Sequence, residues 1–208
     1  MPQAIVITRP FYDETTSYLH RWNLDVVKQA KAKSNSVADL KYKRANRKEL
    51  ESIVKKLKPE VIILNGHGSS DTILGQGDEV LIKAGKNEHI LKNSNVFSLS
   101  CSSAKVLGPA SIKAGAKSYI GYKEDFVFAY PKDYATRAEQ DPLAKLFLEP
   151  TTKLATALVN GNPPEDCHEI GINAFLKNLQ QVLLSNSTEE YVARFLVWDL
   201  TNQVYLHS

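Results

Sequence analysis

Short runs of apolar and β-branched residues alternate with helix-forming segments through the first 125 residues of this 208-residue chain. Residues 4–8, 61–64, 96–99 and 118–120 have the length and composition of strands, and the last three are mainly apolar. Such runs are typical of strands that are buried on both faces of a sheet. Strands that alternate with helices predict a parallel sheet between two layers of helices.

The segments between these strands carry the signals of helices. Residues 12–31 place apolar side chains at helical spacing. A second helix is expected to run from about Asn46 to Leu57, because Asn46 and Glu49 have the spacing of an N-cap and its returning carboxylate. Residues 39–42 are expected to form a short strand between the two helices.

The sequence changes character after residue 131. A Gly-Asn-Pro-Pro sequence at residues 161–164 is typical of a turn and not of a domain linker. The chain after residue 131 is predicted to form three helices, at residues 134–148, 152–159 and 170–198, the last with a break near residues 185–187.

These patterns predict one domain over residues 1–208. Its first part, residues 1–130, would be an α/β core that holds the functional residues, and residues 131–208 would add a helical part. The sequence contains no internal repeat and no low-complexity segment that would suggest another organisation.

The composition excludes several classes of protein. A net charge of +3, 43% hydrophobic and 24% charged residues are ordinary for a globular domain and exclude disordered, collagen-like and coiled-coil chains. Two cysteines, Cys101 and Cys167, form no disulfide framework and suit a reducing compartment. No apolar stretch approaches the ~20 residues that cross a bilayer, and the first ten residues lack the pattern of a signal peptide. We therefore expect a cytoplasmic protein with no membrane segment.

Positive charge is concentrated in residues 28–58, where eleven Lys and Arg face three Asp and Glu. Such a stretch is able to contact nucleic acid or another polyanion. The simpler interpretation is that the charges lie on the solvated faces of two helices. Because no aromatic stacking platform is interleaved with the charges, nucleic acid is not the expected partner. Binding of a polyanion remains an alternative function.

Two of the predicted strands end in residues with catalytic chemistry. His67 follows the run at residues 61–64, and Cys101 follows the run at residues 96–99, 34 positions later. Right-handed crossovers bring the carboxyl ends of parallel strands to one edge of the sheet, where ligands bind. If the two strands are neighbours, about 4.8 Å apart, a thiol and an imidazole project over one crevice. This is the minimum set for nucleophilic acyl transfer.

The flanking residues fit this chemistry. Gly66 and Gly68 leave the backbone beside His67 uncrowded, so the N–H groups of Gly68 and Cys101 are candidates for an oxyanion hole. Residues 102–104 are expected to open a helix, whose N-terminus would lower the pKa of the Cys101 thiol.

At these positions the sequence resembles the caspase–hemoglobinase class (clan CD) of cysteine peptidases, which includes caspases, gingipains, clostripain, legumain, separases and the CHAT proteins. The class has an apolar strand that ends in His-Gly, as at His67, and a later apolar strand that ends in Cys, as at Cys101. Cys-Ser-Ser-Ala at residues 101–104 and the sequence AGAKSYIGY at residues 114–122 make the resemblance closest to the separase and CHAT branch. It covers residues 61–125, extends back to residue 4 through the order of strands and helices alone, and does not explain the C-terminal helices.

The resemblance implies a caspase-like three-layer α-β-α sandwich and a cysteine endopeptidase. His67 and Cys101 take the positions of the catalytic dyad, and Gly68 takes the oxyanion position. Protein or peptide substrates and self-processing are implied, and no cofactor or metal is. A catalytically inactive interaction module with the same fold is the alternative.

Specificity is expected to depend on a charged residue near the dyad. Asp125 matches the acid-bearing position of separases and predicts cleavage after Lys or Arg. Arg9, at the end of the first strand, lies near the position where caspases use an arginine to bind an acidic residue. Asp13 and Glu124 are further candidates for substrate binding.

Two other features of the sequence have simpler interpretations than a functional site. Cys167 and His168 are adjacent but lack the second pair of ligands that a zinc site needs. Asp71 follows His67 closely enough in sequence to orient it, although an acid in a turn is the simpler interpretation.

Overall fold

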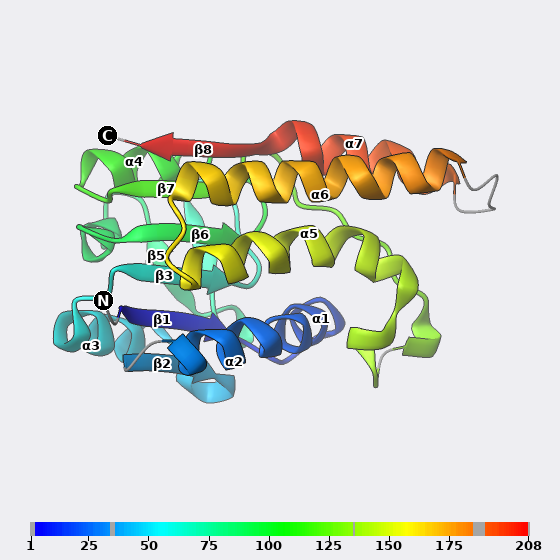
Figure 1. Ribbon diagram of the computed structural model, residues 1–208. Helices are drawn as coiled ribbons and strands as arrows, with labels where there is room; N and C mark the ends of the chain where they lie inside the picture. The colour runs from blue at the N-terminus through cyan, green and yellow to red at the C-terminus, as the bar shows by residue number, and fades with distance from the viewer. Residues whose placement is uncertain (1–2, 34–35, 135, 185–189, 208) are drawn as a thin grey trace.

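The structure is a computed structural model that describes residues 3–33, 36–134, 136–184 and 190–207 (Figure 1). Its centre is a six-stranded sheet with the order β2-β1-β3-β6-β7-β8. The first five strands in this order are parallel, and β8 is antiparallel to β7. The mostly parallel sheet is therefore confirmed. The strands are β1 (Ala4–Arg9), β2 (Ser36–Lys41), β3 (Val61–Asn65), β6 (Asn95–Leu99), β7 (Ser118–Tyr122) and β8 (Gln203–His207).

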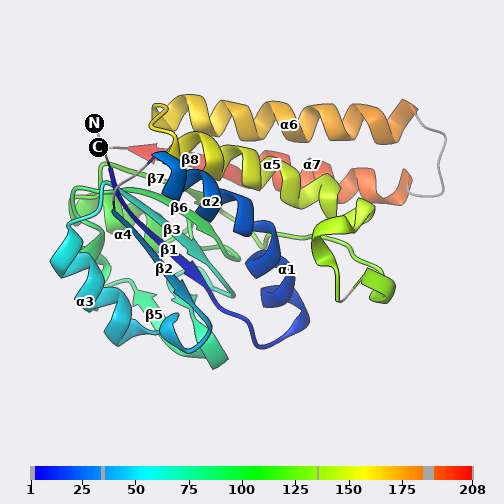
Figure 2. The same cartoon turned by 60° about the horizontal axis from the view of Figure 1, so that its bottom comes forward.

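Helices cover both faces of the sheet, which confirms the predicted three layers (Figure 2). One face is covered by α1 (Glu14–Trp22), α2 (Leu24–Lys33) and α5 (Pro142–Val159). The other is covered by α3 (Arg47–Leu57), α4 (Leu107–Lys113) and the hairpin of β4 (Thr72–Leu74) and β5 (Val80–Lys83). On the first of these faces, α6 (Pro164–Leu184) packs beside α5 and contributes Cys167 to the same apolar cluster, and α7 (Ala193–Asn202) packs against α6. The 3-10 helices are η1 (Tyr42–Arg44), η2 (Gln76–Asp78), η3 (Glu88–Leu91), η4 (Lys132–Tyr134), η5 (Ala138–Gln140) and η6 (Glu190–Val192).

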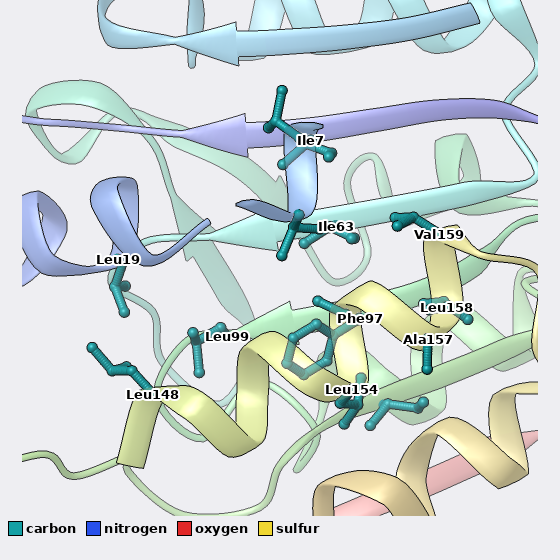
Figure 3. Close-up of a cluster of buried hydrophobic side chains, with 14 of the residues drawn as sticks. Ile7, Leu19, Ile63, Phe97, Leu99, Leu148, Leu154, Ala157, Leu158 and Val159 are labelled. Atoms are coloured by element: carbon teal, nitrogen blue, oxygen red, sulfur yellow. The ribbon is translucent and has the colours of Figure 1, made fainter. Parts of the chain in front are cut away.

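The apolar runs arise because each central strand is buried on both sides. Ile63 and Phe97 join the cluster under α1, α2 and α5, whereas Ile62 and Val96 join the cluster on the opposite face. This is the two-residue period of a strand. Figure 3 shows Ile63 and Phe97 near Leu154, a residue of α5. The residues of the sheet are thus held in register by two apolar cores.

The boundaries differ from the prediction where side chains end an element. The helix expected at residues 12–31 is two helices, because the Asn23 side chain donates to the carbonyl of Leu19 (2.9 Å) and to the Asn65 side chain (3.0 Å). Asn46 caps α3 as predicted, and its side chain accepts from the N–H of Glu49 (2.9 Å). The Glu49 carboxylate pairs with Arg44 instead of returning to the cap.

Where the structure describes the C-terminal part, it lacks the break expected between residues 148 and 152 and contains one additional strand. The two helices expected at residues 134–148 and 152–159 are the single helix α5, which begins at the Asp141 cap and continues through Pro150. The end of the chain forms β8 instead of continuing the helix. The break expected near residues 185–187 lies outside the described residues. Within the described residues, no helix has the length and hydropathy needed to cross a membrane.

A buried ion pair joins the ends of β1 and β2. Arg9, which is 2% exposed, donates to both carboxylate oxygens of Asp39 at 2.9 and 2.6 Å. Its remaining nitrogen donates to the carbonyl of His20 at 3.0 Å. Such a bidentate pair is both strong and directional. Each of the three guanidinium nitrogens of Arg9 therefore donates a hydrogen bond within the fold.

Asp39→Ala is expected to lower the free energy of unfolding by about 3 kcal/mol or more, because the buried Arg9 charge is left uncompensated. Urea denaturation followed by circular dichroism measures the change. Asp25→Ala is the control, since Asp25 and its partner Lys28 are 75% and 74% exposed, and it is expected to cost less than about 1 kcal/mol. Equal losses in the two variants would contradict a structural role for the Arg9 pair.

Candidate active site at the carboxyl edge of the sheet

The pairing of β3 with β6 brings the ends of the two strands together. Asn65 lies opposite Leu99, and His67 and Cys101 each follow two residues later. The N–H of Gly66 donates to the carbonyl of Leu99 at 3.3 Å. The two strands are neighbours, which is the condition that the sequence argument set, and both loops leave the sheet at the same edge.

Gly68 allows a close approach of the two loops. A Cβ atom at this position would lie 3.0 Å from the Cβ of Ser100 and 3.2 Å from the carbonyl oxygen of Cys101. Gly68 also lies opposite Ile73 in an isolated antiparallel bridge. The hydrogen bonds of this bridge run from the N–H of Ser69 to the carbonyl of Thr72 and from the N–H of Leu74 to the carbonyl of His67. Among the described residues, no partner accepts from the N–H of Gly68, as a candidate oxyanion donor requires.

His67 is held by a carboxylate from a different element. Its Nε2 atom lies 2.7 Å from Oδ2 of Asp13, and the side chains are 34% and 38% exposed. The other oxygen of Asp13 caps α1 by accepting from the N–H of Thr16 at 2.7 Å. Burial acts to raise the pKa of Asp13, but the hydrogen bonds from Thr16 and His67 outweigh it and lower the pKa. With Nε2–H donating to the carboxylate, Nδ1 of His67 is left as the proton acceptor.

Cys101 lies in a half-buried position that disfavours its charged form. The Sγ atom is 3.9 Å from the carbonyl oxygen of Phe126. Burial raises the pKa of the thiol, and the negative charge of Asp125 raises it further. A polar cluster lies beneath, where the hydroxyls of Ser98 and Ser100 are 2.6 Å apart.

The expectation that a helix begins directly after Cys101 is wrong. Residues 101–106 form turns, and α4 begins at Leu107. Ser102 has a φ of +53°, in the left-handed region, and its N–H donates to the carbonyl of Glu124 at 3.1 Å. The N-terminus of α4 therefore does not lie directly after Cys101, where it would lower the pKa of the thiol.

Residues 125–127 form the segment beside Cys101, and hydrogen bonds hold this segment from two sides. On the side of the cysteine loop, the Ser102 hydroxyl donates to the Asp125 carboxylate at 2.7 Å. From α7, the indole N–H of Trp198 donates to the carbonyl of Asp125 at 2.8 Å, and Asp199 accepts from the N–H of Val127 at 3.0 Å. A C-terminal helix thus fixes one wall of the candidate site.

Asp199 is fully buried, although it carries a carboxyl group. Among the described residues, its Oδ2 atom has no hydrogen-bond partner. Burial raises its pKa well above the usual range, which favours the protonated form. Asp199 was not among the residues that the sequence pattern indicated. The available signal was an acid next to Trp198 in an otherwise apolar part of a helix.

The structure separates the candidates for substrate binding. Asp125 is exposed and lies in the wall beside Cys101. Arg9 lies in its buried ion pair with Asp39, so the expectation that it binds substrate does not agree with its placement. Asp13 contacts His67, and Glu124 pairs with Lys105 at 2.9 Å.

The remaining candidates lie outside this arrangement. Asp71 accepts from Ser69 and Thr72 and pairs with Lys83, so Asp13 and not Asp71 orients His67. Cys167 is buried, with Sγ 3.7 Å from the carbonyl of Asn162. The part of the chain that the structure describes holds no cluster of three or more potential metal ligands.

The fold is similar to that of a solved gingipain structure, the complex of Porphyromonas gingivalis RgpB pro- and mature domains. The TM-score is 0.60 and the sequence identity 9%, and the match covers 99% of this chain but 47% of that chain. The chain therefore has the caspase-like fold, and it spans about half the length of this neighbour. At this identity the likeness shows the fold alone.

A second solved structure, alanine–glyoxylate aminotransferase from Nostoc sp., matches at 11% identity over 87% of this chain and 55% of that chain. Its TM-score of 0.32 is too low to indicate a shared fold. No family model and no curated protein matches the sequence.

In a Cys167→Ala background, iodoacetamide is expected to alkylate Cys101 in the folded protein, with a rate that rises to a midpoint above the usual thiol pKa. Asp125→Asn is expected to lower this midpoint, because it removes a negative charge that disfavours the thiolate. The pH profile of the alkylation rate measures both effects. A midpoint below that of free cysteine would contradict the described surroundings of Cys101.

Asp199→Asn is expected to flatten the pH dependence of stability. The folded protein holds a proton on Asp199 that the unfolded chain releases above its pKa near 3.8, so this group destabilises the fold progressively as the pH rises through that value and up to the raised folded pKa. Asparagine has no proton to lose and still offers an acceptor to Val127. Urea denaturation at about pH 5 and about pH 8 measures the difference, and parallel profiles would show that Asp199 is not buried in its neutral form.

Proposed function

We propose that the chain is a cysteine peptidase domain that hydrolyses peptide bonds with Cys101 as the nucleophile and His67 as the general acid and base. The separase and CHAT branch remains our prediction for its position within clan CD. The solved neighbour with the same fold is a cysteine peptidase. Because this chain spans about half of that neighbour's length, the activity is proposed from the site and not from the likeness.

The proposal rests on one observation. His67 and Cys101 each lie two residues after the paired ends of two neighbouring parallel strands. Two further features support it. Gly68 packs against the Cβ of Ser100 and the carbonyl oxygen of Cys101, and Asp13 holds Nε2 of His67. A nucleophile, a base and a group that orients the base are the parts that covalent acyl transfer requires.

In the proposed reaction, Nδ1 of His67 takes the proton of the Cys101 thiol as sulfur attacks the carbonyl carbon. The negative charge that develops on the carbonyl oxygen is held by the N–H groups of Gly68 and Cys101. His67 then gives its proton to the leaving amine, and a thioester forms on Cys101. A water molecule, activated by His67, hydrolyses the thioester and releases the acid product.

Asp125 supports specificity for Lys or Arg before the cleaved bond. It is an exposed carboxylate on the wall beside Cys101, and its orientation is fixed by Ser102 and, through its backbone, by Trp198. A fixed carboxylate binds a guanidinium group with good geometry. Arg9 forms a buried ion pair with Asp39. Its placement therefore does not support selection of an acidic residue before the cleaved bond.

Fluorogenic peptides that vary only in the residue before the cut test the proposal. Cys101→Ala is expected to lower kcat/KM by at least about a thousandfold, while Cys167→Ala, the matched control at a buried cysteine, retains activity. Asp13→Asn is expected to lower kcat by at least about tenfold, because His67 loses its orienting charge. Asp125→Asn is expected to lower the preference for Arg and Lys over neutral residues.

An electrophilic peptide ketone distinguishes the peptidase from an inactive module with the same fold. Labelling of Cys101, lost in Cys101→Ala and retained in Cys167→Ala, is the expected result. Turnover that persists in Cys101→Ala would refute the proposed nucleophile, and a folded protein that is neither labelled nor active would favour the inactive interaction module.

A further inference from the structure

A cleft with a volume of about 600 Å³ lies at the opposite edge of the sheet, where the strands begin. It is lined by α3 and by the segment that leads into β6. Figure 1 shows α3 at the end of the sheet from which β1 and β3 start. Since β3 and β6 are five residues long, their ~3.3 Å rise per residue places about 16 Å of strand between this edge and the Cys101 edge.

The rim of the cleft is positively charged. Arg47, Lys55, Lys58 and Lys92 line it, and Glu51 is the one acid among its lining residues. Glu51 is engaged by Arg47 at 2.6 Å. Within the described ranges, no ion pair is recorded for the other three cations, all of which are exposed. The cleft therefore presents about three uncompensated positive charges at short range.

The floor of the cleft is apolar. Val54 and Pro59 are buried and Ile90 is half-buried. An inorganic anion makes only polar contacts, so it would gain nothing from an apolar floor. A ligand that combines an apolar or aromatic body with several negative charges contacts both the floor and the rim.

The backbone at the rim is held in place. Lys58 and Asn93 have left-handed φ values of +48° and +65° without being glycine. Their N–H groups donate to Val54 (2.9 Å) and to Gly115 (2.8 Å). Non-glycine residues in this region cost energy and persist where the surrounding structure determines them.

The fold also divides the basic stretch at residues 28–58. Lys31 lies on α2, which packs on one face of the sheet, whereas Lys55 lies on α3 on the other face. The stretch is therefore not one continuous surface for a long polyanion. Its α3 half is joined instead by Lys92, which lies outside the stretch, to form a confined site.

We propose that this cleft binds a phosphorylated small molecule, with the phosphate groups at Lys55, Lys58 and Lys92 and the body of the ligand on Val54, Pro59 and Ile90. Lysine and arginine are the side chains that recognise phosphate, and the volume suits a ligand the size of a mononucleotide. This inference does not depend on the proposed peptidase activity.

Isothermal titration calorimetry of the full chain with adenosine triphosphate and with tripolyphosphate tests the proposal at low and at moderate salt. Lys55→Glu/Lys92→Glu is expected to weaken binding at least about tenfold. The matched control is Lys56→Glu/Lys31→Glu, which makes the same change in net charge at exposed lysines outside the cleft and is expected to alter the Kd less than about twofold. Circular dichroism establishes that both variants are folded.

Binding of both probes with similar Kd, lost only in the cleft variant, would place phosphate groups in the cleft but would overturn the proposed contact of the ligand body with the apolar floor. Tighter binding of adenosine triphosphate, again lost only in the cleft variant, supports a site that also uses the apolar floor. Equal weakening in the two double variants would show general charge attraction and overturn the proposal. Absence of binding at low salt, where attraction between charges is least screened, would overturn it as well.

Discussion

The candidate site depends on the in-register parallel pairing of β3 with β6. This pairing sets Asn65 opposite Leu99, so the loops that carry His67 and Cys101 start level. A slip by one residue would turn every side chain of the shifted strand to the opposite face and disrupt the packing of both cores. The two apolar layers of the sheet therefore determine, at a distance, where an imidazole and a thiol lie.

The C-terminal third of the chain is part of this arrangement. β8 completes the sheet beside β7, and α7 binds the backbone of Asp125 and Val127 through Trp198 and Asp199. One wall of the candidate site therefore depends on residues about 70 positions later in the sequence. Burial favours the neutral form of the Asp199 carboxyl group, which still accepts the hydrogen bond from Val127. A negative charge on Asp199 would raise the pKa of the Cys101 thiol further.

The electrostatics of the site determine how the proposed reaction has to begin. Burial and Asp125 disfavour a free thiolate on Cys101, and α4 begins too late in the chain to offset them. In the proposed mechanism the proton therefore leaves for His67 as sulfur attacks, and the Asp13 carboxylate stabilises the imidazolium that results. The phosphate site that we propose lies at the other edge of the same strands, so the sheet separates the two sites.

The sequence by itself determined the alternation of strands and helices, the α3 cap at Asn46 and the polar strand ends at His67 and Cys101, because burial and backbone preference leave a periodic signal in neighbouring residues. It did not indicate β8, whose pairing partner lies far away in the chain. The tertiary structure alone decided that Asp39 holds Arg9, that Asp13 holds His67 from 54 positions away, and that Ser102 turns away from a helix. These pairings follow from which elements the crossovers bring together, and a local pattern carries no record of such distant partners.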